Sequence, residues 1–203
     1  MWSMSRFSLA FALSALTLPA LAQSPPPDRL RGTIEKVDGS TLTIQTRQGA
    51  TATLTLDDGA TTMIVRAASR ADIKPDSFIG TAAMPDKDGV LHAQEVVIFP
   101  ENLRGTGEGF RPWDLTPGST MTNATVAGQV NSTTGDAVSL TYKGGEKTLV
   151  IPPDAPIVTL APGALSDAKP GVGIIVAMAE KQADGSYHAK RITVGKDGVN
   201  PPM

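Results

Sequence analysis

The sequence contains no cysteine among its 203 residues. Disulfide exchange and thiolate metal sites are therefore excluded, and the fold has to be stabilised by packing alone. Aromatic residues are scarce at 4%, and the formal net charge is only −2, without a run of like charges. A weakly acidic, evenly charged surface argues against nucleic acid or anionic lipid as the main partner, because both require clustered Lys and Arg.

Long hydrophobic runs are also lacking, apart from one near the N-terminus. Residues 7–18 form an apolar segment that follows a single positive charge, Arg6, and precedes the small-residue motif Ala20-Leu21-Ala22. This arrangement predicts a Sec-type signal peptide over residues 1–22, cleaved after Ala22, and thus a periplasmic or secreted protein. The run is shorter than the ~20 residues of a membrane span, so we expect no membrane insertion; an uncleaved anchor is the alternative.

After a proline-rich leader over residues 23–29, the sequence contains short runs in which apolar and polar residues alternate. Such alternation is typical of half-buried strands, and the first three runs predict a meander. Glycine supplies the turns between them, because it adopts positive φ without steric cost. These turns are predicted at Asp38-Gly39, Gln48-Gly49 and Asp58-Gly59.

A short helix is expected before the last two strands of this pattern. Ser69 can cap a helical turn while Asp72 reaches back to it, and Pro75 ends the turn. Two strands, over residues 78–84 and 91–99, then form a hairpin.

The same pattern recurs about 96 residues further along the chain. Gly32 and Gly128 lie 96 residues apart, as do Gly39 and Gly135. The helix-ending motif Asp-x-Lys-Pro also occurs twice, 95 residues apart. We infer an internal duplication with two copies, too few for a solenoid.

Two copies of a small strand-rich unit predict an all-β fold with one short helix per repeat, arranged as two tandem OB-like β-barrels. Closure into a barrel is expected because a flat sheet would leave two edges open to aggregation. A sandwich with one sheet from each repeat is the alternative. The predicted parts are a first barrel over residues 30–100, a Gly/Pro-rich linker over 101–125, a second barrel over 126–196 and a C-terminal tail over 197–203.

Several segments resemble a known family. Residues 32–44, residues 71–75 and the closing Asp-Gly hairpin are similar in both halves to exported bacterial domains of unknown function, of the type numbered 5666. The linker motif over residues 107–115 and the tail resemble a two-copy subgroup of that family, although the subgroup has histidine at the position of Phe110. The resemblance implies small OB-like barrels and an exported protein, and it implies no activity.

The linker contains the one place where aromatic, cationic and anionic side chains converge: Phe110, Arg111, Trp113 and Asp114. Exposed Trp and Arg often dominate recognition surfaces, so these residues are candidates for partner binding. The alternative, which we favour, is a structural clasp in which Trp113 is mostly buried between the barrels and Arg111 pairs with Asp114 or Glu108. Replacing a buried Trp113 by alanine would cost roughly 3 to 5 kcal/mol.

The two histidines, His92 and His188, occupy equivalent places after a hairpin turn in each repeat. They could form a two-point site for a divalent metal ion if the barrels pack about a twofold axis, because neutral imidazole binds zinc, copper or nickel. The alternative is that both lie on a solvated face and match only because of the duplication.

No catalytic motif is evident. The glycine-rich segment over residues 104–109 lacks the ending of a phosphate loop, and no nucleophile–base pair or carboxylate pair can be assigned. We therefore expect that the protein is not an enzyme. We also expect no cofactor, apart from a divalent metal ion if His92 and His188 form a site. The sequence favours a non-enzymatic binding or scaffold module for a protein, glycan or small ligand. Metal handling through the histidines and an enzyme with an unrecognised site are the alternatives.

Overall fold

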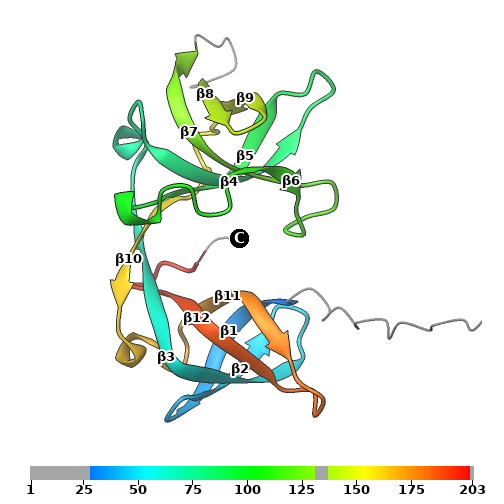
Figure 1. Cartoon of the computed structure of the whole chain (residues 1–203), viewed down its shortest axis with the longest axis vertical. Coiled ribbons are helices and arrows are strands. Elements are labelled where there is room, and N and C mark those ends of the chain that lie inside the picture. The colour runs from blue at the N-terminus through cyan, green and yellow to red at the C-terminus, as the bar shows by residue number, and fades with distance from the viewer. Residues whose placement is uncertain (1–27, 131–136, 202–203) are drawn as a thin grey trace, which may run out of the picture.

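The computed structural model describes residues 28–130 and 137–201, and it confirms the all-β fold. Two small barrels lie one above the other along the long axis of the molecule (Figure 1). The predicted signal peptide with its cleavage after Ala22, the leader up to residue 27, and Gly135 lie outside the described residues. The elements are β1 (Asp28–Asp38), β2 (Thr41–Thr46), β3 (Thr51–Ala67), η1 (Arg70–Asp72), β4 (Phe78–Pro85), β5 (Leu91–Ile98), η2 (Glu101–Leu103), β6 (Gly109–Pro112), β7 (Thr120–Val130), β8 (Ala137–Tyr142), β9 (Gly145–Val150), β10 (Ile157–Gly163), η3 (Leu165–Asp167), β11 (Gly173–Lys181) and β12 (Tyr187–Gly195), where η marks a 3₁₀ turn.

Barrel A, the lower barrel in Figure 1, consists of β1, β2, β3, β12 and β11 in that order around its wall. Neighbouring strands are antiparallel except β3 and β12, which run parallel. Because β11 pairs with β1, the wall is closed and has no free edge. Aliphatic side chains such as Ile34, Leu42 and Ile192 fill the interior, each no more than 1% exposed.

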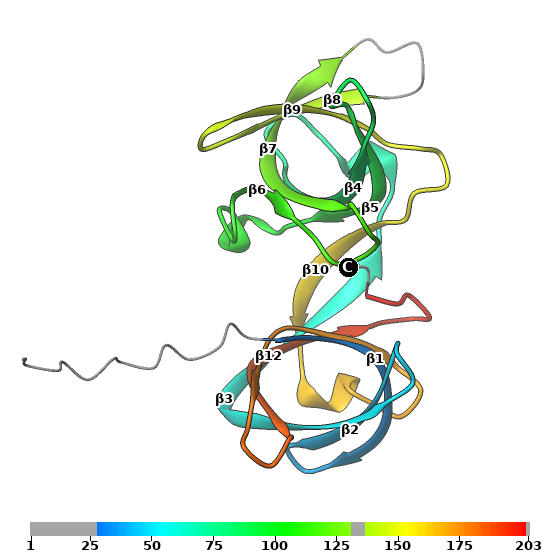
Figure 2. The ribbon, with the colours of Figure 1, turned by 90° about the vertical axis from the view of Figure 1, so that its right-hand side faces the viewer.

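Barrel B, the upper barrel, has the same circular order, built from β7, β8, β9, β5 and β4. Its parallel pair is β9 with β5, and β4 pairs with β7 to close the wall. Its core includes Ile79, Leu140 and Leu149, which are fully buried. The short strand β6 lies outside this wall and pairs with the first part of β7. Figure 2 shows both barrels nearly end-on as closed rings.

The barrels do not follow the predicted boundaries of residues 30–100 and 126–196. The hairpin β4–β5 from the first half completes barrel B, and the hairpin β11–β12 from the second half completes barrel A. The reason is that the chain does not turn back at Asp58-Gly59. Strand β3 runs on from Thr51 to Ala67 and crosses to the other barrel. Its pairing with β12 skips the residues between Leu56 and Thr61, where Gly59 has a φ of 74°.

The other predicted boundaries also shift. Arg29, assigned to the leader 23–29, belongs to β1, and residues 120–125 of the predicted linker already form the start of β7. The predicted tail is packed against the barrels, because Val199 contacts the core between them and Pro201 is buried. Parts of the predicted leader, linker and tail therefore belong to the folded structure.

The two crossing segments meet at the centre of the molecule. Strands β3 and β10 pair antiparallel there, with Val65 opposite Leu160. Val65, Val97 and Val158 form a small third core at this point, separate from the cores of the barrels. The two barrels are thus joined by a hydrogen-bonded ladder with its own apolar contacts.

Equivalent hydrogen bonds and bulges occur in the two barrels. The N–H of Ile34 donates to the carbonyl of Val172, and the N–H of Val126 donates to the carbonyl of Ser77. A bulge follows both Ile34 and Val126. These two residues lie 92 positions apart, so the 96-residue match of Gly32 with Gly128 is not kept in this strand. The connection between β7 and β8 is longer than that between β1 and β2, which restores an offset of 96 at Ile44 and Leu140.

The predicted helical turn is confirmed as the 3₁₀ turn η1. The Asp72 carboxylate accepts hydrogen bonds from the N–H and the hydroxyl of Ser69, both at 2.7 Å, and these bonds lower the pKa of Asp72. Turn η3 repeats the arrangement, since Asp167 accepts from the N–H of Ala164 at 2.9 Å. Each turn lies just before the hairpin that completes the other barrel.

Candidate functional site

The candidate residues of the linker lie where barrel B faces barrel A. Strand β6 runs along β7, and the segment after it turns back tightly, because the N–H of Trp113 donates to the carbonyl of Ser119 at 2.8 Å. The hydroxyl of Ser119 accepts a second bond, from the N–H of Thr116. In Figure 1 this segment extends from β6 toward the lower barrel. The turn therefore presents Trp113 and Asp114 to the first strand of barrel A.

Three guanidinium groups surround the indole ring of Trp113. The Cζ atom of Arg29 lies 3.8 Å from the ring centroid, and those of Arg111 and Arg31 lie at 5.5 and 5.7 Å. Arg29 and Arg31 come from β1 of barrel A, whereas Arg111 comes from β6. Cations within about 6 Å of an aromatic face are attracted by its quadrupole. The ring is thus held by contacts from both barrels.

Asp114 reinforces this contact. Arg31 donates to both of its carboxylate oxygens, at 2.8 and 3.2 Å, and the Nη1 atom of Arg29 lies 3.0 Å from Oδ1. The hydrogen bond and charge of Arg31, together with Arg29, lower the pKa of Asp114 to about 2 against the opposing effect of burial. Bidentate pairing of this kind is among the stronger polar contacts of proteins.

Arg29, Arg31, Arg111, Trp113 and Asp114 are called the junction cluster below. Its three positive charges face one negative charge, that of Asp114. Burial lowers the pKa of the Arg111 guanidinium, and the neighbouring charge of Arg29 lowers it further. Within the described residues, Nε of Arg31 and Nε1 of Trp113 are buried and have no hydrogen-bond acceptor. The cluster therefore has an excess of positive charge and of unused donors.

Some predicted details of this region are wrong. Arg111 does not pair with Asp114 or Glu108; its Nη1 donates to the carbonyl of Gly107, and Glu108 accepts from the N–H of Lys143. Trp113 is mostly buried, as the clasp hypothesis expects, but arginine side chains from both barrels lie over its ring. Phe110 is 40% exposed, with the Lys147 ammonium 4.9 Å from its ring centroid.

Arg29 and Arg31 were missed by the sequence reasoning. Arg29 falls in the predicted leader and Arg31 in the predicted first barrel, although residues two apart on a strand project from the same face. The signal in the sequence is an arginine on each side of the apolar Leu30, which indicates a strand that begins before residue 30. Their partner Asp114 is 83 positions from Arg31, a separation that local patterns do not reveal.

The structure does not bring the two histidines together. His92 lies on β5 of barrel B and His188 on β12 of barrel A, and the hairpins that carry them point to opposite ends of the molecule in Figures 1 and 2. Each has its own carboxylate partner: Asp86 lies 3.3 Å from His92, and Asp57 lies 2.9 Å from His188. Within the described residues, no group of three or more His, Cys, Asp or Glu side chains could hold a metal ion. A shared two-histidine site therefore does not form in this arrangement.

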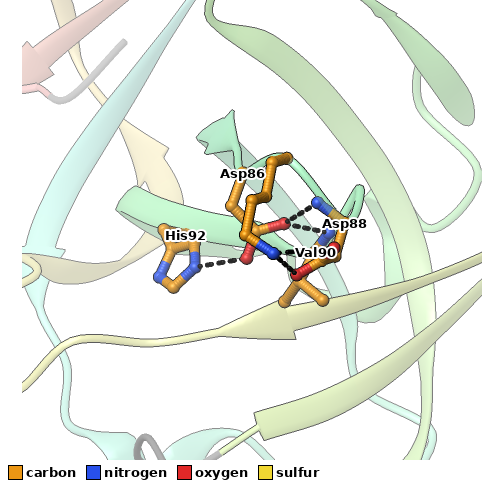
Figure 3. A network of polar contacts seen from close by, with 5 residues as sticks. Asp86, Asp88, Val90 and His92 are labelled. Carbon is orange, nitrogen blue, oxygen red and sulfur yellow. Dashed lines mark hydrogen bonds and ion pairs between the residues drawn. The ribbon is translucent and has the colours of Figure 1, made fainter.

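The surroundings of His92 show a turn with local polar contacts (Figure 3). The Asp86 carboxylate accepts from the backbone N–H groups of Asp88 and Val90, each at 2.9 Å. Burial raises the pKa of Asp86, but the hydrogen bonds of His92, Val90 and Asp88 outweigh it and lower the pKa overall. This carboxylate orders the tip of the β4–β5 hairpin.

One larger hollow lies beside barrel A, where β3 crosses over. It encloses about 670 Å³ between the skipped residues of β3 and the turns η2 and η3. Its charged side chains are Asp57, Asp58 and Arg191. Asp57 is already engaged by His188, and Arg191 reaches Thr61 at 3.4 Å. The hollow offers no concentrated charge comparable to that of the junction cluster.

Comparison with known proteins adds no assignment. No protein-family model matches the chain, and neither the curated proteins nor the solved structures give a match. Among the described residues, no helix is long and apolar enough to cross a membrane. The junction cluster therefore has to be interpreted from its own chemistry.

Proposed function

We propose that this protein is a non-enzymatic binding or scaffold module, exported to the periplasm or beyond, whose binding site is the junction cluster. The export part of the proposal is supported by the sequence of residues 1–22. The binding part is supported by the way that Trp113 and its arginines gather on one surface. Trp and Arg are the residues that most often dominate recognition sites.

The single observation that carries the proposal is that the cluster is built from both barrels and remains partly open. Arg31 is 10% exposed and anchors the group, whereas Arg29 is 31% exposed and Asp114 is 50% exposed. A buried anchor beside accessible charges is what a binding site needs, because the anchor fixes the geometry and the exposed groups meet the partner.

The chemistry of the cluster favours binding over catalysis. A guanidinium group stays protonated near neutral pH, and an indole N–H does not ionise there. The carboxylate of Asp114, with a pKa of about 2, is a poor base. Such groups hold a partner by charge and hydrogen bonds and do not transfer protons.

We also propose that the two-barrel architecture arose by internal duplication followed by exchange of the last hairpins. The matching bulges after Ile34 and Val126 support it, as do the equivalent pairings of Leu54 with Tyr187 and of Leu149 with Leu91. In this proposal each ancestral unit closed its own barrel, and the present chain closes each barrel with the other unit's hairpin.

The binding proposal can be tested by affinity capture from the envelope of the source cell. Immobilised protein of residues 23–203 should capture a partner, and Arg111→Gln should lose it while Arg66→Gln keeps it. Arg66 is the matched control because it is an exposed arginine on β3 outside the cluster. Equal capture by both variants would contradict the proposed site.

A further inference from the structure

We infer that the ligand of the junction cluster is an oxyanion, such as a phosphate, sulfate or carboxylate group carried by the partner. This inference rests on the proposed function, because it names the chemical class that the proposed binding site would accept. It is drawn from the charges and donors of the cluster alone.

The junction cluster has more positive than negative charge. Arg29, Arg31 and Arg111 bring three positive charges within 5.7 Å of one ring centroid, and Asp114 supplies a single negative charge. Like charges held this close repel one another, and the effect is stronger where side chains are partly shielded from water. A bound anion would relieve that repulsion.

The junction cluster also contains N–H donors that have no acceptor. Nε of Arg31 and Nε1 of Trp113 are buried without an acceptor among the described residues. Leaving a buried donor unpaired is costly, and both groups are donors only. The Arg31 side chain is nine-tenths buried and fixed by Asp114 through its two other nitrogens, so its Nε–H has a defined direction. Oxygen atoms of an anion are the acceptors that suit such donors.

Arg29 and Arg111 also keep N–H donors that a ligand could use. Arg29 contacts Asp114 through Nη1, and Arg111 uses Nη1 for the carbonyl of Gly107. Each guanidinium has five N–H donors in a planar fork that matches carboxylate and phosphate geometry. The cluster therefore keeps donors on three side chains for one ligand, while Asp114 holds two of those side chains in place.

Trp113 provides a direct measurement, since it is the only tryptophan in residues 23–203. Its fluorescence should change saturably when inorganic phosphate or sulfate is added at constant ionic strength, with sodium chloride as the reference salt. Arg111→Gln should weaken the affinity by about tenfold or more. Arg111 is the informative position, because it makes no bond to Asp114 and its loss leaves the contact between the barrels intact.

Two further variants control for structural damage. Arg66→Gln should bind like the wild type, and Arg111→Lys should bind with intermediate affinity because it keeps the charge but not the fork. Thermal melting shows whether each variant is folded. A fluorescence change that does not saturate, or one that is equal in the wild type and Arg111→Gln, would overturn the inference.

The outcome separates this inference from the proposed function. If envelope capture still depends on Arg111 while phosphate and sulfate do not bind, the oxyanion class is wrong and the binding site stands. If neither depends on Arg111, the cluster serves only to hold the barrels together, and both proposals fail.

Discussion

The two barrels share one strand order but close their walls differently. In barrel A, β3 and β12 pair at eight positions, on both sides of the skipped residues near Gly59. In barrel B, the equivalent strand is split into β9 and β10, which pair with β5 at two and three positions. The split falls at Pro152, Pro153 and Pro156, and proline has no N–H to give to a ladder.

The buried polar residues are also unevenly divided. The described parts of the chain contain six buried polar or charged residues. Only one of them, Thr62 on β3, lies on a wall strand of barrel A. The others lie on β4, β5 and β7 or directly before β7, and they are Thr81, Glu95, Ser119, Thr122 and Asn123. Barrel A is thus built for packing, and barrel B keeps polar groups next to the segment that carries Trp113. The comparison indicates that buried polar groups are concentrated in barrel B.

The largest effect is expected when the two halves of the chain are separated. Residues 28–104 alone contain β1 to β5, and the extended β3 carries the β4–β5 hairpin away from its own meander. We expect this fragment to form a dimer in which each copy closes the other's barrel. Size-exclusion chromatography with light scattering measures this directly, and a monomer with native strand content would show that β3 can turn back at Gly59.

Truncation of equivalent core leucines should have the next largest effect. Leu54 in barrel A and Leu149 in barrel B are both fully buried, and replacing either by alanine should cost about 2 to 5 kcal/mol of unfolding free energy. Leu54→Ala should cost more, because the interrupted wall around Leu149 can collapse into the cavity more easily. Both variants should melt in one transition, since each barrel contains strands of both halves. Two separate calorimetric peaks would show that the barrels unfold independently.

The backbone at the crossover gives a smaller effect. Gly59 has a φ of 74°, so Gly59→Ala should destabilise the fold by about 1 to 2 kcal/mol even though the space around it is open. Gly128 is a matched control on β7, where an added Cβ also meets nothing and φ is not positive. Gly128→Ala should leave the urea midpoint nearly unchanged. A similar loss in both variants would remove backbone strain as the explanation.

The contact between the barrels should add the smallest effect, which is present near neutral pH and lost in acid. Arg31 and Arg29 lower the folded-state pKa of Asp114 from 3.8 to about 2. The stability that this provides is therefore present above about pH 4 and is lost as the pH falls toward 2. Asp114 is half exposed, so solvent screening limits the contribution to about 1 kcal/mol or less. Wild type and Asp114→Asn should differ in melting temperature at pH 6 and converge near pH 2; a constant difference would point to another cause.

Much of the fold could be predicted because it depends on short-range patterns. The alternation around Leu42 and Leu54, and the Ser69 cap, each specify a local element that the structure contains. Which hairpin closes which barrel could not be predicted, because the two walls have the same strand order and local patterns do not distinguish them. That choice depends on whether the chain turns at Gly59 or passes through it, and positive φ at glycine is compatible with either.

The candidate site was predicted in part for the same reason. Trp113, Arg111 and Asp114 are adjacent in the sequence, so their shared chemistry was visible. Arg29 and Arg31 join them only through the packing of barrel A against barrel B, and no local spacing encodes that contact. The histidines show the opposite case, since a shared site depended on how the two barrels pack, and each histidine instead contacts a carboxylate of its own surroundings.

The completion of each barrel by a hairpin from the other half of the chain also sets an order of assembly. All five wall strands of barrel B are available once Val150 has been made, whereas barrel A needs β12, which ends at Gly195. A chain that emerges from a ribosome or a translocation channel N-terminus first would therefore complete its middle before its beginning. Strands β1 to β3 must wait as an open meander while later residues arrive. The outer faces of β1 and β2 carry charges and threonines, and charged side chains beside an open edge disfavour its pairing with other chains.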